Sequence, residues 1–260
     1  MKIKTFVIGY VLALAIFLFA QHRSMPEQDT RFVVVDLTHS IDVTMPTSEL
    51  SEHAKSREGM AASDRDDYFA CQIRSAEHYG THLDAPAEFG RGLWTVDQIP
   101  SERLVAPLVV LNVQSKAARN PDYRVGVDDI ANWEQVHGHI PQGAVVMANT
   151  GWDSRWNSVK DYRNADARQI MHFPGYSTEG ARFLLEGRTA IGLGIDTLSI
   201  DYGPSTNFPV HKYAQSHSLY QLENVANLAQ APEFGGTVVV APSKLGGGSG
   251  APVRILALTK

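Results

Sequence analysis

Cysteine is almost missing from this 260-residue chain, in which Cys71 is the only one. A single thiol has no partner within the chain, so an intrachain disulfide is excluded. Cys71 lies in residues 68–73, a segment of strand-forming apolar residues, where a free cysteine is usually a buried and unreactive thiol. The sequence therefore predicts a structural role for Cys71 rather than a nucleophilic one.

An excess of basic residues is absent as well. The chain has 23 Lys and Arg against 28 Asp and Glu, a formal net charge of −5. Its basic residues are scattered, which argues against nucleic acid as a partner. The sequence has no fixed-period repeat, low-complexity tract or long charge run. With 43% hydrophobic residues, the chain is predicted to build one substantial core.

A long apolar run occurs at the start of the sequence, where Lys2 and Lys4 precede residues 6–20. A bilayer span needs roughly 20 apolar residues, so this shorter run is typical of a signal peptide rather than a permanent N-terminal anchor. We expect a leader over residues 1–20, a linker over 21–30 and one domain over 31–260. The protein is then exported, periplasmic or secreted, and contacts a membrane only through an uncleaved leader.

Strand-like segments outnumber helix-like ones in the rest of the chain. Short apolar runs predict strands at residues 31–37, 109–113, 144–148, 190–195, 237–240 and 254–258. Acidic or serine starts followed by apolar residues predict helices at 128–136 and 177–186. The glycine-rich residues 246–250 lie between two of the strands, and we expect a tight loop with close backbone approach there rather than a flexible linker.

Candidate metal ligands are concentrated in residues 78–88, which contain His78, His82, Asp84 and Glu88. The glycine and proline among them disfavour a helix. In an extended chain His82 and Asp84 project to the same side, and Gly80 allows a turn that brings His78 toward them. Two imidazoles and a carboxylate suit zinc, manganese or ferrous iron and leave a position open for water. The spacing favours a metal site over isolated surface histidines.

A second candidate group contains His211, His217 and Glu223. Spacing alone leaves its role open. Residues 220–226 could instead form an ordinary amphipathic helix with a solvated Glu223, and His211 could lie exposed in a loop after Pro209.

Together these segments resemble the cyclase family of metal-dependent hydrolases, which includes bacterial kynurenine formamidase and isatin hydrolase. The family signature is H-x-G-T-H-x-D-x-P-x-H. The matching residues here are His78, Gly80, Thr81, His82, Asp84 and Pro86, with Glu88 in place of the usual third histidine. The resemblance continues through residues 94–100, 150–152, 194–201 and 247–254. In the formamidase branch a histidine and a glutamate twelve residues apart complete a second metal site, and His211 and Glu223 have that separation.

The resemblance implies a swivelling β/β/α domain, an α/β fold with a strand-rich mixed sheet and few helices, in a homodimer or homotetramer. It implies a divalent cofactor, zinc or manganese, as one or two ions. The implied ligands are His78, His82 and Asp84 for a first ion and Glu88, His211 and Glu223 around a second position. Glu88, Glu223 and His217 are the candidates for proton transfer, and Glu88 could serve as ligand or as base.

The implied reaction uses metal-activated water to cleave the carbon–nitrogen bond of a cyclic amide or N-formyl compound. The substrate is a small molecule, and an aromatic one could contact pocket residues among Phe69, Trp94, Trp152, Trp156, Phe173 and Tyr176. Two alternatives keep the metal. One is lactone or ester hydrolysis, or a cyclising dehydration. The other is an exported binding protein without catalysis, because Glu88 replaces a histidine of the motif.

Overall fold

The structure is a computed structural model that describes residues 32–42, 44–47, 56–60 and 70–260. The predicted leader and linker lie outside the described residues, as do Phe69 and the side chain of Cys71. Residues Val33–Thr259 form one compact unit. Among the described helices, none combines the length and the apolar character needed to cross a bilayer.

A mixed sheet in the strand order β1-β12-β11-β5-β7-β9-β10-β4 dominates this unit. Its strands are β1 (Val33–Asp36), β4 (His82–Asp84), β5 (Val105–Asn112), β7 (Val145–Asn149), β9 (Gly192–Ile195), β10 (Tyr220–Glu223), β11 (Gly236–Pro242) and β12 (Gly250–Thr259). Neighbours within β5, β7, β9 and β10 run parallel, and the remaining pairs are antiparallel. Because the first residues of the long strand β12 also pair with β4, the sheet closes into a ring.

The remaining elements are short. The helices are α2 (Gln114–Ala117), α3 (Val127–His137), α4 (Val159–Arg163), α5 (Thr178–Arg182) and α6 (Pro209–Ser216), with a π-helical turn at Phe183–Gly187 and 3₁₀ turns at Val96–Gln98, Ser101–Arg103, Trp152–Arg155 and Leu228–Gln230. Two small sheets pair β2 (Ser56–Met60) with β3 (Ala70–Arg74) and β6 (Arg124–Val125) with β8 (Gly175–Tyr176).

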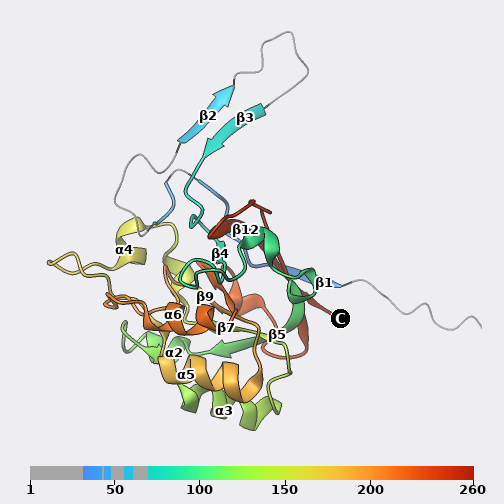
Figure 1. Ribbon diagram of the computed structural model, residues 1–260. Coiled ribbons are helices and arrows are strands. Elements are labelled where there is room, and N and C mark those ends of the chain that lie inside the picture. The colour runs from blue at the N-terminus through green and yellow to red at the C-terminus, as the bar shows by residue number, and fades with distance from the viewer. Residues whose placement is uncertain (1–31, 43, 48–55, 61–69) are drawn as a thin grey trace, which may run out of the picture. The chain divides into compact units, whose positions relative to one another are not determined.

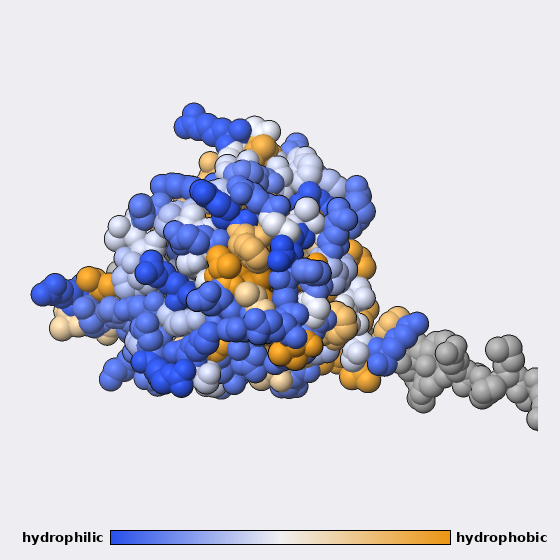
Figure 2. Space-filling view, turned by 90° about the horizontal axis from the view of Figure 1, so that it is seen from below, coloured by the Kyte–Doolittle hydropathy of each residue, from blue (hydrophilic) through white to orange (hydrophobic). Residues whose placement is uncertain are grey.

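Alternating residues of the parallel strands build two separate cores. In β5, Leu108 and Val110 belong to the core inside the ring, whereas Val109 and Leu111 pack against the helices outside it. This follows from the two-residue side-chain period of a strand. Figure 1 shows α3 and α5 side by side below the sheet, and residues of α3, α5 and α6 share the outer core. Their solvent side is mostly hydrophilic (Figure 2), as expected for helices that bury one face.

The predicted strand-rich α/β fold with a mixed sheet and few helices is confirmed. Each predicted strand corresponds to an observed one, and the helix predicted over 128–136 is α3. The alternative of an amphipathic helix over residues 220–226 is wrong, because residues 220–223 form the buried strand β10. The glycine-rich loop is tight as predicted: Gly247 has a φ of +72°, and a Cβ on Gly250 would lie 2.5 Å from His78 Cε1, so the backbone passes close to this ring.

Candidate metal-dependent active site

The candidate site is built around strand β4, which lies between β10 and β12. Leu83 points into the core of the ring, so its neighbours His82 and Asp84 project to the opposite face. The register places Glu223 of β10 across from His82 and Gly250 of β12 across from Asp84. Strand alternation and cross-strand pairing therefore gather these polar groups on one face of the sheet.

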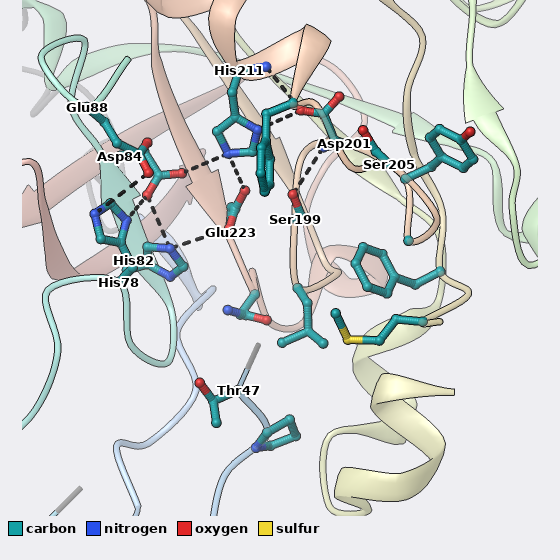
Figure 3. Close-up of a pocket in the computed structure, with 18 of the residues that line it drawn as sticks. Thr47, His78, His82, Asp84, Glu88, Ser199, Asp201, Ser205, His211 and Glu223 are labelled. Atoms are coloured by element: carbon teal, nitrogen blue, oxygen red, sulfur yellow. Dashed lines mark hydrogen bonds and ion pairs between the residues drawn. The ribbon is translucent and has the colours of Figure 1, made fainter. Parts of the chain in front are cut away.

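His78, His82 and Asp84 form the first cluster of candidate ligand atoms. Gly80 has a φ of +65°, the left-handed conformation that glycine adopts without strain, and this turn returns His78 to the strand. His78 Nδ1 lies 2.6 Å from Asp84 Oδ1, and His82 Nε2 lies 3.2 Å from the same oxygen. Figure 3 shows the two imidazoles converging on the carboxylate. The structure thus brings together the residues that the spacing singled out.

Asp84, His211 and Glu223 form a second cluster, so Asp84 belongs to both. His211 Nε2 lies 3.0 Å from Glu223 Oε1 and 3.7 Å from Asp84 Oδ2. The other oxygen of Glu223 lies 3.4 Å from His82 Nε2. His211 is buried within α6, and the alternative that placed it in an exposed loop is wrong.

The outer nitrogens of two histidines are held by groups behind the cluster. His82 Nδ1 lies 2.9 Å from Gly80 O, which can only accept a hydrogen bond, so Nδ1 carries the proton and Nε2 faces the cluster. His211 Nδ1 lies 2.7 Å from Asp201 Oδ2. Asp201 also accepts hydrogen bonds from the backbone N–H groups of Val210 and His211, which begin α6 and would otherwise lack partners. The buried carboxylate of Asp201 therefore caps the start of α6 and also orients the His211 ring.

The charges of the two clusters depend on one another. Burial disfavours ionisation of Asp84, but attraction to His82 and hydrogen bonds from the surrounding imidazoles hold its pKa well below the usual range. Burial likewise opposes charge on His82 and His211, yet the facing carboxylates hold the pKa of each ring well above that of a free histidine. These buried carboxylates require a compensating cation, which protons on the rings or a divalent ion can supply.

The donor set fits a divalent ion. Asp84 Oδ2 is buried and has no hydrogen-bond partner among the described residues, which is uncommon for a carboxylate oxygen. Imidazole nitrogens with carboxylate oxygens are the ligands of catalytic zinc and manganese sites. His78, His82 and Asp84 would hold one ion, and His211 and Glu223 adjoin that position through Asp84. Their role as ligands stays a prediction.

Glu88 lies beside the clusters rather than within either of them. Its Oε1 is 3.9 Å from His78 Nε2, and its Oε2 accepts a hydrogen bond of 2.7 Å from Gln215 Nε2. The Gln215 amide is fixed because its oxygen accepts from the backbone N–H of Phe89. Burial and the charge of Asp84 raise the pKa of Glu88 to about 7. Gln215 thus holds one oxygen of Glu88, while the other oxygen faces His78 in the lining of the cavity.

His217 is the predicted site residue that the structure places elsewhere. It is exposed at the end of α6, packs against Tyr213 and has its Nδ1 2.8 Å from the Tyr213 carbonyl oxygen. It does not line the cavity. The suggestion that His217 transfers protons at this centre is therefore withdrawn, because α6 turns this side chain to solvent while His211 faces inward.

A cavity of about 330 Å³ opens onto the clusters, a volume at the lower end of the usual range for small-molecule sites. Its apolar wall includes Pro46, Phe89, Met171, Phe173, Leu198 and Phe208. Of the aromatic residues suggested from the sequence, Phe173 lines it, whereas Trp152 and Tyr176 are core residues and Trp94 and Trp156 pack against cores. Sequence reasoning missed Phe89 and Phe208, although both flank predicted ligand segments.

Fold and site together define an α/β enzyme with a candidate metal centre for a small substrate. The model of the Cyclase family matches residues 35–202. An isatin hydrolase of Roseibium aggregatum is 33% identical over 190 residues, 70% of this chain and 72% of that protein. A kynurenine formamidase of Salinibacter ruber is 26% identical over 182 residues, 70% of this chain and 76% of that protein.

A solved structure agrees with these relatives. Isatin hydrolase A from Labrenzia aggregata, bound to benzyl benzoate, is 34% identical with a TM-score of 0.82, covering 88% of this chain and 94% of that chain. The chain belongs to the Cyclase family, as its motifs indicated. It is a metal-dependent hydrolase that acts on carbon–nitrogen bonds other than peptide bonds.

Proposed function

We propose that this protein opens a cyclic amide fused to an aromatic ring, the substrate class of isatin. The observation that carries the proposal is that the clusters line a small cavity whose wall also contains aromatic side chains. Phe173 is buried in this wall, and Phe89 and Phe208 stand at its exposed edge with ring centroids 5.6 Å apart. Such faces suit a flat aromatic substrate. The 33% identity to an isatin hydrolase supports the same class.

The chain's own residues account for binding and proton transfer. A divalent ion held by His78, His82 and Asp84 would supply activation of water and polarisation of the substrate carbonyl. Glu88 Oε1 takes a proton from the attacking water, while Gln215 holds the other oxygen of the same carboxylate. As the new carbon–oxygen bond forms and the carbon–nitrogen bond breaks, Glu88 passes that proton to the departing nitrogen. The products are a carboxylate and an aromatic amine on one molecule.

We propose a single zinc or manganese ion per chain. Glu88 stands outside both clusters and is held by Gln215. Glu223 Oε1 is already engaged by the backbone N–H of Ile200 at 2.8 Å and by His211. These contacts favour a role for Glu88 as the base and for Glu223 as a partner of His211. They argue against both residues serving as ligands of a second ion. Metal analysis of purified protein should give one ion per chain.

The test of the function compares one variant of the centre with a matched histidine variant outside it. Native protein should add one water to isatin faster than to an N-formyl arylamine or an aromatic lactone, with products identified by mass. His82→Ala should lose both the ion and turnover, whereas His217→Ala should keep both. Preference for the formyl compound or the lactone would contradict the substrate class, and full metal retention by His82→Ala would contradict the site.

We also propose that the chain is exported and assembles as a homodimer or homotetramer. Export is supported by the lysines and apolar run within residues 1–20, and assembly by the family resemblance. Mass measurement of the exported protein should show loss of the leader, and light scattering should give two or four chains. A full-length mass or a monomer would contradict the respective proposal.

A further inference from the structure

His78 differs from the other two histidines in how its outer nitrogen is held. His82 and His211 direct Nδ1 to an acceptor behind the cluster and Nε2 toward the carboxylates. The His78 ring has the reverse orientation, with Nδ1 at 2.6 Å from Asp84 Oδ1. Its Nε2 lies 3.0 Å from the hydroxyl of Ser249, which is 171 residues away in the β11–β12 connection. A hydroxyl can donate or accept, so its own partner decides the tautomer of His78.

That partner is Glu77. The Ser249 hydroxyl donates to Glu77 Oε2 at 2.8 Å, and the same oxygen accepts the backbone N–H groups of Ser249 at 2.9 Å and Gly250 at 3.3 Å. An ionised carboxylate can only accept hydrogen bonds, so the Ser249 hydroxyl is the donor in its bond to Glu77. The single hydroxyl proton of Ser249 is thereby used, and its lone pair faces His78.

The consequence for His78 follows from hydrogen-bond direction. Because Ser249 presents an acceptor, His78 Nε2 carries a ring proton. In the metal-free protein Nδ1 shares a further proton with Asp84 at 2.6 Å. A bound ion takes the place of that proton, so Nδ1 is the ring atom that binds the ion. Were the serine hydroxyl turned toward the ring, Nε2 would accept and Nδ1 would carry the proton. A protonated Nδ1 cannot bind a metal ion.

The backbone holds Glu77 and Ser249 in register with β4. The carbonyl oxygen of Ser249 accepts the N–H of Ala85 at 2.8 Å, and Gly250 pairs with Asp84 across the two strands. A Cβ on Gly250 would lie 2.5 Å from His78 Cε1, so the imidazole rests directly on this strand. The paired backbones of β4 and β12 therefore hold the hydroxyl, the ring and Asp84 next to one another.

We propose that Glu77 and Ser249 are positioning residues that fix the His78 tautomer and so make Nδ1 its metal-binding atom. The inference rests on the metal centre of the proposed function but not on its substrate. It assigns a role to the glycine-rich loop, whose serine reaches His78 through a hydroxyl supported by Glu77.

Zinc affinity of the full-length protein, measured by competition with a chromophoric chelator, tests this without turnover. Ser249→Ala should bind zinc about 10- to 100-fold more weakly, the range for loss of an outer partner of a ligand. Ser249→Thr keeps the hydroxyl and should restore most of the affinity, and Glu77→Gln should weaken binding in the same direction. Ser243→Ala, an exposed serine of the same connection, should bind like the native protein. Thermal unfolding of the metal-free variants should match that of native protein.

A long-range ¹H–¹⁵N spectrum of the zinc-loaded protein should place the His78 proton on Nε2. Unchanged zinc affinity in Ser249→Ala, no rescue by threonine, or a proton on Nδ1 would overturn the inference. So would a loss of affinity matched by a fall in the thermal stability of the metal-free variant. Native protein that binds no zinc or manganese would instead overturn the metal centre of the proposed function. Native protein that binds zinc and shows the Ser249 effect but opens no lactam would leave this inference standing.

Discussion

Neither Gly250 nor Gly175 has space for the methyl group of an alanine, but the atoms that fill the space differ between the two sites. A Cβ on Gly250 would meet the His78 ring at 2.5 Å, whereas one on Gly175 would meet the backbone nitrogen of Tyr202 at 2.2 Å. A side chain can rotate away more easily than backbone can shift. Gly250→Ala should therefore displace His78 and weaken zinc binding roughly tenfold or more, with little loss of stability. Gly175→Ala should cost about 1–3 kcal/mol in the free energy of unfolding.

Urea unfolding and chelator competition on the two alanine variants measure these effects separately. If Gly250→Ala loses as much stability as Gly175→Ala, the ring is not free to move and the site is part of the rigid core. Native zinc affinity in Gly250→Ala would mean that His78 is not a ligand.

Glu88 is the position where this chain departs from the family motif, and Glu88→Gln tests whether this residue acts as a base or as a metal ligand. The amide keeps the size of the side chain but cannot take a proton. We expect turnover to fall about 100-fold or more, the usual worth of general acid–base catalysis, while metal content stays native. Metal analysis and steady-state kinetics on the same preparation give both values. A loss of the ion with turnover would identify Glu88 as a ligand and favour a second ion position.

At the residue scale, the sequence predicted those site residues whose positions depend on local spacing along the chain. His78, His82 and Asp84 were recognisable because an extended strand and one glycine turn bring them together. Gln215 and Ser249 were not, because their partners lie 126 and 171 residues away. Nothing in the sequence around Gln215 or Ser249 shows which distant residue each side chain contacts. His217 was misassigned for the same reason, since the end of α6 decides where that ring points.

At the element scale, strand β10 shows where local pattern gives no decision. Residues 220–226 contain apolar residues that suit a short helix or a buried strand, and such runs cannot be distinguished by periodicity alone. The parallel neighbour β9 and the antiparallel neighbour β4 settle the matter by pairing. Leu222 then faces the ring core while Glu223 faces the site. The position of Glu223 is thus a consequence of tertiary pairing.

Helix α3 is tied to the segment before β9 by an ion pair with a clear pH dependence. Glu134 accepts hydrogen bonds of 2.5 and 2.7 Å from Arg188, and another from the backbone of Ile140. The bonds from Arg188 lower the pKa of Glu134 from 4.5 to about 2. A pKa depressed by folding stabilises the protein above the unfolded value, and that stabilisation is lost as pH falls from about 4.5 through about 2.

Glu134→Gln should therefore lower the free energy of unfolding by about 1 kcal/mol at pH 7. The difference from native protein should shrink as the pH is lowered through this window. Urea unfolding at a series of pH values gives the comparison, with the exposed Glu102→Gln as control. A difference that stays constant down to pH 2 would show that the carboxylate charge does not carry the contact.

At the scale of the whole molecule, the candidate site lies where the sheet closes. Strand β4 contributes His82 and Asp84, and it is the strand through which β12 and β10 are joined. His211 comes from α6, which packs in the outer core. An ion bound to His78, His82 and Asp84 therefore lies on the strand that joins β10 to β12, and it adjoins His211 of α6 through Asp84. The site is complete only when the ring is closed, so metal binding and global folding should be coupled.

Metal binding should for this reason stabilise the whole unit. An ion that binds the folded chain alone adds RT ln(1 + [L]/Kd), about 2.7 kcal/mol at a free concentration 100 times Kd. Calorimetry of metal-free protein should show the unfolding temperature rising with added zinc or manganese, and a chelator should reverse the shift. His82→Ala should show little rise, because its cluster loses a ligand. An equal rise in His82→Ala would place the stabilising ion elsewhere, for example beside His172, which already lies 2.9 Å from Asp122. Asp84, whose Oδ2 has no hydrogen-bond partner among the described residues, lies on the strand that closes the ring. A rise in unfolding temperature that needs the native cluster would therefore show that the ion stabilises the closed sheet as well as the site.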